Sequence, residues 1–421
     1  MGFADFYFER QQNFQVKISE KPNTDLKFIV VIPCFNEFKL LETLNSIRNC
    51  EKIKSSIEVI IVFNSSEDAS SEIVNQNKKS YYEAKNWIAQ QEDSSLRFFI
   101  LNEQNLPRKF AGAGLARKIG MDQAVHRFNS INQDKGILVS LDSDSVLMPN
   151  YLAELEKHFN KFSKTNVITS YFEHQVTGDE FSNDIYNAIT IYELYLRYYK
   201  LALKYTRFPY SFYTIGSCFA VSANAYAKQG GMSRKQAGED FYFLHKIFPL
   251  GNCFEINTTC VYPSSRPSDR VPFGTGPMVK SIAESDNNEF FTYNFDTFKE
   301  IKSFLNHIDD LYHIDDIELD KLLDLIPDCI ADFLRRNKIE KALTEISKNS
   351  SNIESFKKRF FNWFDAFKIL KYLNFAHEKY YSKQLLKLEV EKLLRLISKS
   401  EIEEKNCKSY LEIVRKIERK F

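Results

Sequence analysis

The sequence lacks the features that would indicate a membrane-spanning, disulfide-stapled or nucleic-acid-binding protein. None of its apolar runs is long enough to span a bilayer, and its first residues carry no signal-peptide pattern. The formal net charge of +1 offers no general attraction for nucleic acid. We therefore expect a cytoplasmic protein that binds no nucleic acid, with peripheral contact to the inner membrane face left open. Nothing in the sequence indicates an oligomeric state.

Cysteine and glycine are also sparse. The seven cysteines are scattered without any C-x-x-C spacing, which predicts reduced thiols instead of a zinc site or a disulfide framework. The last glycine is Gly276, and beyond it apolar residues recur at helical spacing between lysines and glutamates. We predict an N-terminal extension over 1–25, an α/β domain over 26–285 and an all-helical C-terminal domain over 286–421.

The α/β prediction rests on short apolar runs that alternate with helical patterns. Buried strands are expected at Lys27–Pro33, Ile57–Phe63, Leu96–Leu101 and Val167–Phe172. Strands that alternate with helices predict βαβ units, and hence a mostly parallel sheet flanked by helices. Ligands bind such sheets beyond the carboxyl ends of their strands.

The stretch Ile137–Ser145 begins as an apolar strand pattern and ends in Asp-Ser-Asp-Ser, so that one residue separates Asp142 from Asp144. In an extended segment, residues i and i+2 point to the same side. Two carboxylates at one point repel each other unless a hard divalent cation lies between them. The alternative is a polar loop in which Asp144 or Ser145 caps the next helix.

Polar residues of three later segments are further candidates. Gly238-Glu239-Asp240 opens a helical pattern, where backbone dipoles also stabilise carboxylates for purely structural reasons. Arg266 and Arg270 lie on a polar loop, and guanidinium forks match phosphate, although a solvated surface loop would look the same. The run Phe212–Val221 reads as a strand interrupted by Gly216, where a ligand or another backbone could approach closely.

Further polar candidates follow the strand at Val167–Phe172. That strand places Glu173 and His174 at its carboxyl end. The aromatic-rich helix predicted at 180–205 either packs its tyrosines into a core or offers them to a sugar ring. A lone histidine is more often structural than functional.

Five motifs in this order resemble the family 2 glycosyltransferases, which have the GT-A fold. The resemblance covers about residues 26–280 and leaves out the helical tail. Its motifs are VVIPCFNE (30–37), IEVIIVFNSSEDAS (57–70), AGAGLARKIGMDQA (111–124), SLDSDS (140–145) and GGM…GED (230–240).

The resemblance implies a role for each motif. The first two loops and the A-R-K-x-G motif would lie near the nucleotide, through Pro33, Phe35, Glu37, Asn64 and Arg117. Asp144, with Asp142 beside it or near the ribose, would hold Mn²⁺ or Mg²⁺ on the diphosphate, assisted by Arg266 and Arg270. Asp240 would be the catalytic base, and Glu239 would orient the base or the acceptor. Glu173, His174 and Gly216 would lie on the acceptor side.

One departure from the family pattern concerns the donor. Phe63 and Asn64 stand where the family usually has two acidic residues, the second of which often binds uracil or ribose. An asparagine can still hydrogen-bond a base, so the sequence leaves the base open.

The function expected from these features is transfer of a sugar from a nucleoside-diphosphate sugar to a hydroxyl of a saccharide or lipid-linked acceptor. The resemblance implies metal dependence, inversion and a role in polysaccharide or glycoconjugate synthesis. A non-catalytic sugar-nucleotide-binding scaffold acting through its helical tail is an alternative. A sugar-phosphate nucleotidyltransferase is another, but it would want a glycine- and basic-rich loop where Cys34–Glu37 has neither.

Overall fold

The computed structural model describes residues 2–11, 14–234, 238–270, 274–285, 289–398 and 406–420. The chain divides into two compact units. The first, here the α/β unit, comprises Met1–Tyr186, Tyr213–Lys280 and Glu418–Phe421. The second, here the helical unit, comprises Asn187–Phe212 and Ser281–Ile417.

The α/β unit contains strands that alternate with helices, as predicted. Its strands are β1 (Leu26–Cys34), β2 (Ser56–Ser66), β3 (Leu96–Leu106), β4 (Ile137–Ser140), β5 (Val146–Leu147), β6 (Val167–Phe172), β7 (Phe219–Ser222) and β8 (Cys253–Tyr262). Its helices are α1 (Asp5–Glu9), α2 (Leu40–Arg48), α3 (Ser71–Ile88), α4 (Ala113–Ser130), α5 (Tyr151–Lys161), α7 (Ala223–Lys228), α8 (Glu239–Ile247) with the short η1 (Phe248–Leu250), and most of α9 (Thr275–Ala283).

All eight strands form one sheet in the order β3-β2-β1-β4-β7-β6-β8-β5. The pairings show that six strands run in one direction and that β7 and β5 run in the other. The predicted mostly parallel sheet is therefore confirmed. Because β7 is reversed, the loop before it reaches the same edge as the carboxyl ends of β1, β2, β4, β6 and β8.

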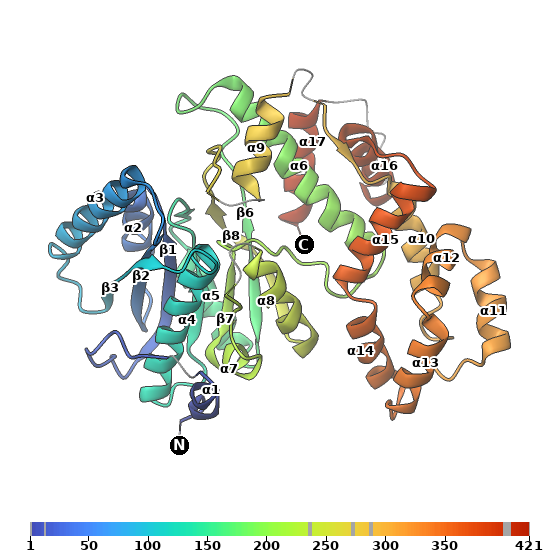
Figure 1. Cartoon of the computed structure of the whole chain (residues 1–421), viewed down its shortest axis with the longest axis horizontal. Coiled ribbons are helices and arrows are strands. Elements are labelled where there is room, and N and C mark those ends of the chain that lie inside the picture. The colour runs from blue at the N-terminus through green and yellow to red at the C-terminus, as the bar shows by residue number, and fades with distance from the viewer. Residues whose placement is uncertain are drawn as a thin grey trace. The chain divides into compact units, whose positions relative to one another are not determined.

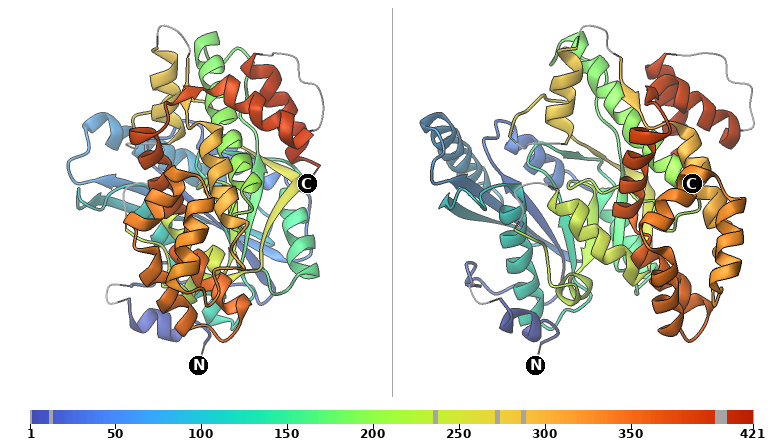
Figure 2. Two further views of the ribbon diagram at one scale, coloured as in Figure 1. Left: turned by 90° about the vertical axis from the view of Figure 1, so that its right-hand side faces the viewer. Right: turned by 45° about the vertical axis from the view of Figure 1, so that its right-hand side comes forward.

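Helix α4 packs directly on the sheet, against β1 and β2 (Figures 1 and 2). A Cβ atom at Gly120 would lie 2.4 Å from Cγ1 of Val31, so only glycine permits this close approach. The glycine of the A-R-K-x-G motif thus allows the helix that carries Arg117 to pack closely on the sheet. On the same helix, Arg127 forms a buried ion pair with Glu58 of β2, its Nη2 donating to Oε1 at 2.6 Å.

The N-terminal segment is fixed to the same helix through a buried polar cluster. The hydroxyls of Tyr7 and Tyr226 both donate to Oδ1 of Asp122, at 2.6 and 2.8 Å. Lys118 Nζ donates to Oδ2 of Asp122 at 2.7 Å. With a charged partner and two hydroxyls, the buried carboxylate is fully hydrogen-bonded, as burial requires.

The helical unit contains most of α6 (Asn183–Tyr205) and the helices that follow the α/β unit. Its elements are α10 (Phe295–Leu305), α11 (Asp316–Leu325), α12 (Asp328–Arg336), α13 (Ile339–Lys348), α14 (Ile353–Trp363), α15 (Ala366–Lys379), α16 (Leu386–Ser398), α17 (Cys407–Glu418), and strands β9 (Phe291–Thr292) and β10 (Gln384–Leu385), which pair. The predicted helical C-terminal region is confirmed, with this two-stranded ribbon added to it. Within the described residues, no helix is both long and apolar enough to cross a bilayer.

The tyrosines of α6 pack inside the helical unit. Tyr198 is 1% exposed and donates to the carbonyl of Tyr293 at 2.8 Å. Tyr195 and Tyr199 contact the rings of Phe290 and Phe298. For these tyrosines the core-packing alternative is correct and the sugar-stacking one is wrong.

Candidate active site

The predicted site residues come together at the edge of the sheet where the parallel strands end. Pro33 is the last but one residue of β1, and Phe35 and Glu37 follow that strand directly. Asp142 and Asp144 follow β4, and the loop with Arg266 and Arg270 follows β8. The parallel register of β1 with β2 and with β4 places their loops side by side.

Glu37, Asp144, Arg266 and Arg270 form a network of alternating charges. Glu37 is fully buried and accepts from Arg266 Nη2 at 2.6 Å and from Arg270 Nη1 at 2.9 Å. Asp144 Oδ2 accepts from Arg270 Nη2 at 2.8 Å and from Arg266 Nη2 at 3.4 Å. Arg270 Nη1 also donates to the carbonyl of Phe35 at 3.2 Å. We call this group the Glu37 network.

The two arginines of the Glu37 network are not on a solvated loop. Their side chains are 23% and 24% exposed, and they balance the two carboxylates. Burial raises the pKa of Asp144, although the Arg270 guanidinium pulls it down. In this arrangement, carboxylates hold both guanidinium groups in place.

A second network surrounds Arg117, which is 3% exposed. Its Nη2 donates to Asp142 Oδ1 at 2.8 Å and its Nε to Glu239 Oε1 at 3.2 Å. Its Nη1 donates to Ser140 Oγ at 2.6 Å and to the carbonyl of Gly216 at 3.2 Å. Burial alone would lower the pKa of Arg117, but Asp142 and Glu239 outweigh it and raise the pKa. The predicted donor-side residue thus connects the D-x-D segment to the start of α8.

Asp240 lies beside this Arg117 network. Burial, followed by the charge of Glu239, raises the pKa of Asp240 to about 7, although Arg117 acts in the opposite direction. A Cβ atom on Gly216 would lie 2.8 Å from Arg117 Nη2 and 3.1 Å from Asp240 Oδ2. Glycine at 216 therefore lets these two side chains approach the backbone. A carboxylate that titrates near neutrality suits general-base chemistry.

The strand predicted over Phe212–Val221 is shorter than expected. Only β7, Phe219–Ser222, pairs in the sheet, and Gly216 lies in the loop before it. Its carbonyl accepts hydrogen bonds from Arg117 and from Ser140 Oγ instead of from a neighbouring strand. The local sequence favoured a strand, but these side-chain donors hold the segment in the site.

The carboxylates of the D-x-D segment retain oxygen atoms that a divalent cation could use. Both arginine contacts of Asp144 fall on Oδ2, and Arg117 contacts only Oδ1 of Asp142. Among the described residues, none donates a hydrogen bond to Asp144 Oδ1 or Asp142 Oδ2. No cluster of three or more acidic, histidine or cysteine ligands occurs in the described part of the chain. Two carboxylates fit a cation whose remaining ligands are phosphate oxygens and water.

Asn64 at the end of β2 has an unusual hydrogen-bonding state. The side chain is 1% exposed, and its Nδ2 donates to the carbonyl of Cys34 at 3.0 Å, which fixes the amide orientation. Its Oδ1 is buried without a hydrogen-bond partner among the described residues. Asn77 of α3 links this strand end to the first loop, since its side chain donates to the Asn64 carbonyl and accepts from the Asn36 amide, both at 2.8 Å.

Glu173 and His174 directly follow β6 and have different surroundings. Glu173 accepts from the hydroxyl of Tyr171 at 2.7 Å and from Arg419 Nη2 at 3.0 Å. Arg419 also lies over the Tyr171 ring, 4.6 Å from its centroid. His174 is 3% exposed and meets the Phe172 ring edge-on, which is the environment of a packed histidine.

The comparisons with known proteins agree with this geometry. Residues 29–230 match the family described as Glycosyl transferase family 2. This span is a family 2 glycosyltransferase domain. It includes the first four of the five motifs and the loop with Gly216, and it ends before Glu239 and Asp240. The protein is thus a glycosyltransferase, and its α/β sheet with a helical C-terminal region agrees with the expected GT-A architecture.

The chain also resembles solved structures, at low sequence identity. The structure of S. aureus TarS 1–349 in complex with UDP-GlcNAc is 15% identical, with a TM-score of 0.40, over 80% of this chain and 92% of that one. GalNAc-T7 with UDP, GalNAc and Mn2+ is 17% identical, with a TM-score of 0.36, over 71% of this chain and 54% of that one. No curated protein matches in sequence.

Three residues of this glycosyltransferase were missed by sequence reasoning. Ser140 completes the donors and acceptors around Arg117, Asn77 joins the first two loops, and Arg419 binds Glu173. Ser140 lies next to the D-x-D segment, and its position at a strand end was a usable signal. Asn77 and Arg419 lie on helical patterns with no motif, so nothing in the sequence distinguished them.

Proposed function

We propose that this glycosyltransferase transfers a sugar from a nucleoside-diphosphate sugar to an acceptor hydroxyl, with inversion and with a divalent metal. The acceptor would be a saccharide or a lipid-linked glycan in polysaccharide or glycoconjugate synthesis. The observation that carries the proposal is the Arg117 network. One buried guanidinium connects Asp142 of the D-x-D segment to Glu239, the neighbour of Asp240.

The Glu37 network would receive the diphosphate. Mn²⁺ or Mg²⁺ held by Asp142 and Asp144 would supply positive charge to the departing diphosphate when bound. Arg266 and Arg270 share their donors between Glu37 and Asp144, so phosphate oxygens can replace Asp144 as the acceptor while Glu37 keeps both arginines in place. Pro33 and Phe35 would form the backbone on which the nucleotide rests.

Asp240 would act as the general base. As the acceptor oxygen bonds to the anomeric carbon, the bond from that carbon to the diphosphate oxygen breaks, and the acceptor proton passes to the Asp240 carboxylate. One base without a protein nucleophile gives a single displacement, and hence inversion. Arg117 would hold Glu239 and Asp142 so that base and leaving group lie on opposite sides of the sugar. Glu173, His174 and the Gly216 loop are the proposed acceptor side.

Asn64 would contact the base of the donor. Its buried Oδ1 is an acceptor without a donor, and burying such an atom costs free energy unless a ligand supplies the hydrogen bond. Ring N–H groups of uracil, thymine and guanine, or the exocyclic amines of cytosine, adenine and guanine, can supply it. We therefore propose that the base of the donor donates a hydrogen bond to Asn64 Oδ1.

The test is thermal stability in the presence of UDP, dTDP, GDP, CDP or ADP, each with and without Mn²⁺. A ligand that binds only the folded protein raises the melting temperature. We expect a metal-dependent shift with one of these nucleotides, lost in Asp144→Ala and retained in the surface control Asp134→Ala. If no nucleotide shifts the melting temperature, the proposal is wrong and a scaffold role is favoured. A product with retained anomeric configuration in NMR would contradict inversion.

A further inference from the structure

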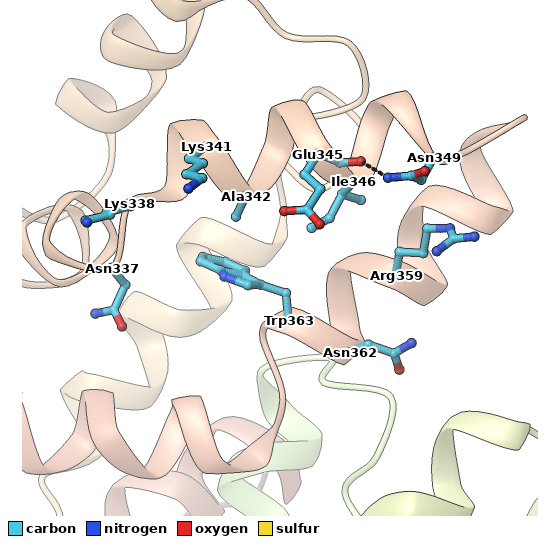
Figure 3. A pocket seen from close by; sticks show the side chains of 10 residues that line it. All are labelled: Asn337, Lys338, Lys341, Ala342, Glu345, Ile346, Asn349, Arg359, Asn362 and Trp363. Carbon is cyan, nitrogen blue, oxygen red and sulfur yellow. Dashed lines mark hydrogen bonds between the residues drawn. The ribbon is translucent and has the colours of Figure 1, made fainter.

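A pocket of about 430 Å³ lies in the helical unit, and none of its lining residues belongs to a sequence motif (Figure 3). Helices α13 and α14 supply most of its walls. Its lining residues are Asn337, Lys338, Lys341, Ala342, Glu345, Ile346, Asn349, Arg359, Asn362 and Trp363. The volume lies within the range of small-molecule sites, roughly 300–1,000 Å³, and suits about two sugar rings.

The charges around the pocket are mostly positive. Lys338, Lys341 and Arg359 line it, against the single carboxylate of Glu345. All four side chains are exposed, and within the described residues none of the three cations forms an ion pair. By contrast, Arg335 and Arg336 on neighbouring α12 are paired with Asp324 and Asp332. The cations at the pocket are therefore available to an anion.

Trp363 gives the pocket an aromatic wall. The indole is held by contacts with the rings of Phe360 and Phe364, and Lys368 Nζ lies 3.9 Å from its centroid. Figure 3 shows the indole opposite Ala342 and Lys341 of α13. A tryptophan in a fixed position offers a flat apolar surface to the C–H face of a sugar ring, and the Lys368 charge adds to the positive potential.

Amide side chains complete the lining. Asn337 Nδ2 donates to the carbonyl of Phe333 at 2.8 Å, and Asn349 Nδ2 donates to the carbonyl of Glu345 at 2.9 Å. These bonds orient both amides, and among the described residues nothing donates to either Oδ1. Sugar hydroxyls are suitable donors for such oxygens.

We propose that this pocket binds an anionic saccharide, a sugar unit that carries a carboxylate or a phosphate, in the acceptor or product glycan. Lys338, Lys341 and Arg359 would bind the anionic group and Trp363 the sugar ring. The proposal rests on the proposed glycosyltransferase function and adds a second glycan-binding site to it. A simple phosphate site would not need the aromatic wall, and a neutral-sugar site would not need the unpaired cations.

The sequence allows a direct optical test, because the chain contains only two tryptophans, Trp87 and Trp363. Trp87→Phe leaves Trp363 as the single fluorophore of that type. Its emission would be titrated with trehalose 6-phosphate, an unsulfated chondroitin disaccharide, neutral trehalose and inorganic phosphate. We expect saturable changes with one or both anionic disaccharides, and about tenfold weaker responses to trehalose and to phosphate.

The variant Lys341→Gln/Arg359→Gln, made in Trp87→Phe, should weaken the response about tenfold or more, since both side chains are exposed and their replacement leaves packing intact. Lys348→Gln on the same helix, outside the pocket, is the matched control and should bind as before. An unchanged affinity in the double variant, equal binding of trehalose, equal binding of phosphate, or no response at all would overturn the proposal. Nucleotide-induced thermal shifts of the same variants report the donor site separately, so the two proposals fail independently.

Discussion

The two charge networks at the sheet edge differ in their ratio of arginines to carboxylates and in how exposed their arginines are. In the Glu37 network, two arginines face two carboxylates, and the arginine side chains are about a quarter exposed. In the Arg117 network, one buried arginine faces Asp142 and Glu239 with Asp240 beside them. In the proposed function, the balanced network exchanges a carboxylate for a phosphate. In the unbalanced network, burial and then the charge of Glu239 raise the pKa of Asp240 to about 7.

The largest effect is expected from Asp240→Asn. Removal of a general base should lower the release of nucleoside diphosphate from the donor by roughly 10²–10⁴-fold, with water or the acceptor as the attacking group. Nucleotide-induced thermal shifts should persist, because the Glu37 network is intact. Asp134→Asn, at an exposed position, is the control. A rate within a few-fold of wild type would exclude Asp240 as the base.

Arg117→Lys keeps the positive charge of the Arg117 network but removes the forked guanidinium group. A lysine cannot reach Asp142, Glu239, Ser140 and the Gly216 carbonyl at once, so we expect about 10–100-fold lower turnover. The free energy of unfolding should fall by about 1–3 kcal/mol, since buried acceptors lose donors. Denaturant unfolding and turnover measured on one sample would check both. A loss of stability with unchanged turnover would make Arg117 purely structural.

The pH dependence should reflect the raised pKa of Asp240, which burial and then the charge of Glu239 cause. With the pKa of Asp240 at about 7, turnover should fall about tenfold per pH unit below that value as the base becomes protonated. For stability the sign is opposite. Between pH 7 and the ordinary value of 3.8, the folded state binds more protons than the unfolded chain, so acidification stabilises it.

Asp240→Asn should remove the part of the pH dependence of stability that arises from Asp240. It should also stabilise the protein at pH 8, by about 1–3 kcal/mol. Denaturant unfolding at pH 6 and pH 8 in both proteins measures it. Equal pH dependence in the two would mean that Asp240 titrates normally.

Smaller effects are expected from substitutions in the Glu37 network. Arg270→Gln removes contacts to Glu37, to Asp144 and to the Phe35 carbonyl. Arg266 also binds Glu37, but its contact with Asp144 is longer, at 3.4 Å. We expect nucleoside-diphosphate binding to weaken about tenfold in Arg270→Gln and about threefold in Arg266→Gln. Isothermal titration with the nucleotide found by thermal shift would rank them. The reverse order would contradict the proposed placement of the diphosphate.

Much of the sheet edge could be predicted because each parallel strand ends in its own motif. Apolar runs located β1, β2, β3 and β6, and the D-x-D segment followed β4 as expected. Strand polarity alone then brings the loops to one edge. The reversed strand β7 was harder, because the local pattern predicted a longer strand, whose first half instead forms a loop held by hydrogen bonds from Arg117 and Ser140 to the Gly216 carbonyl.

The pairing of the candidate residues could not be predicted. Arg266 is 229 positions from Glu37, and Arg419 is 246 from Glu173. No local pattern encodes such partners, and a fork that suits phosphate suits a carboxylate equally well.

The most direct test of the division between the two networks is one experiment on wild type, Asp240→Asn and Arg270→Gln. For each protein, the donor dissociation constant would be measured by titration, and turnover at saturating donor by release of nucleoside diphosphate. The account predicts unchanged affinity with roughly 10²–10⁴-fold lower turnover for Asp240→Asn, and about tenfold weaker affinity with smaller loss of turnover for Arg270→Gln. If both variants lose affinity and turnover together, the two networks act as one site and their proposed division is wrong.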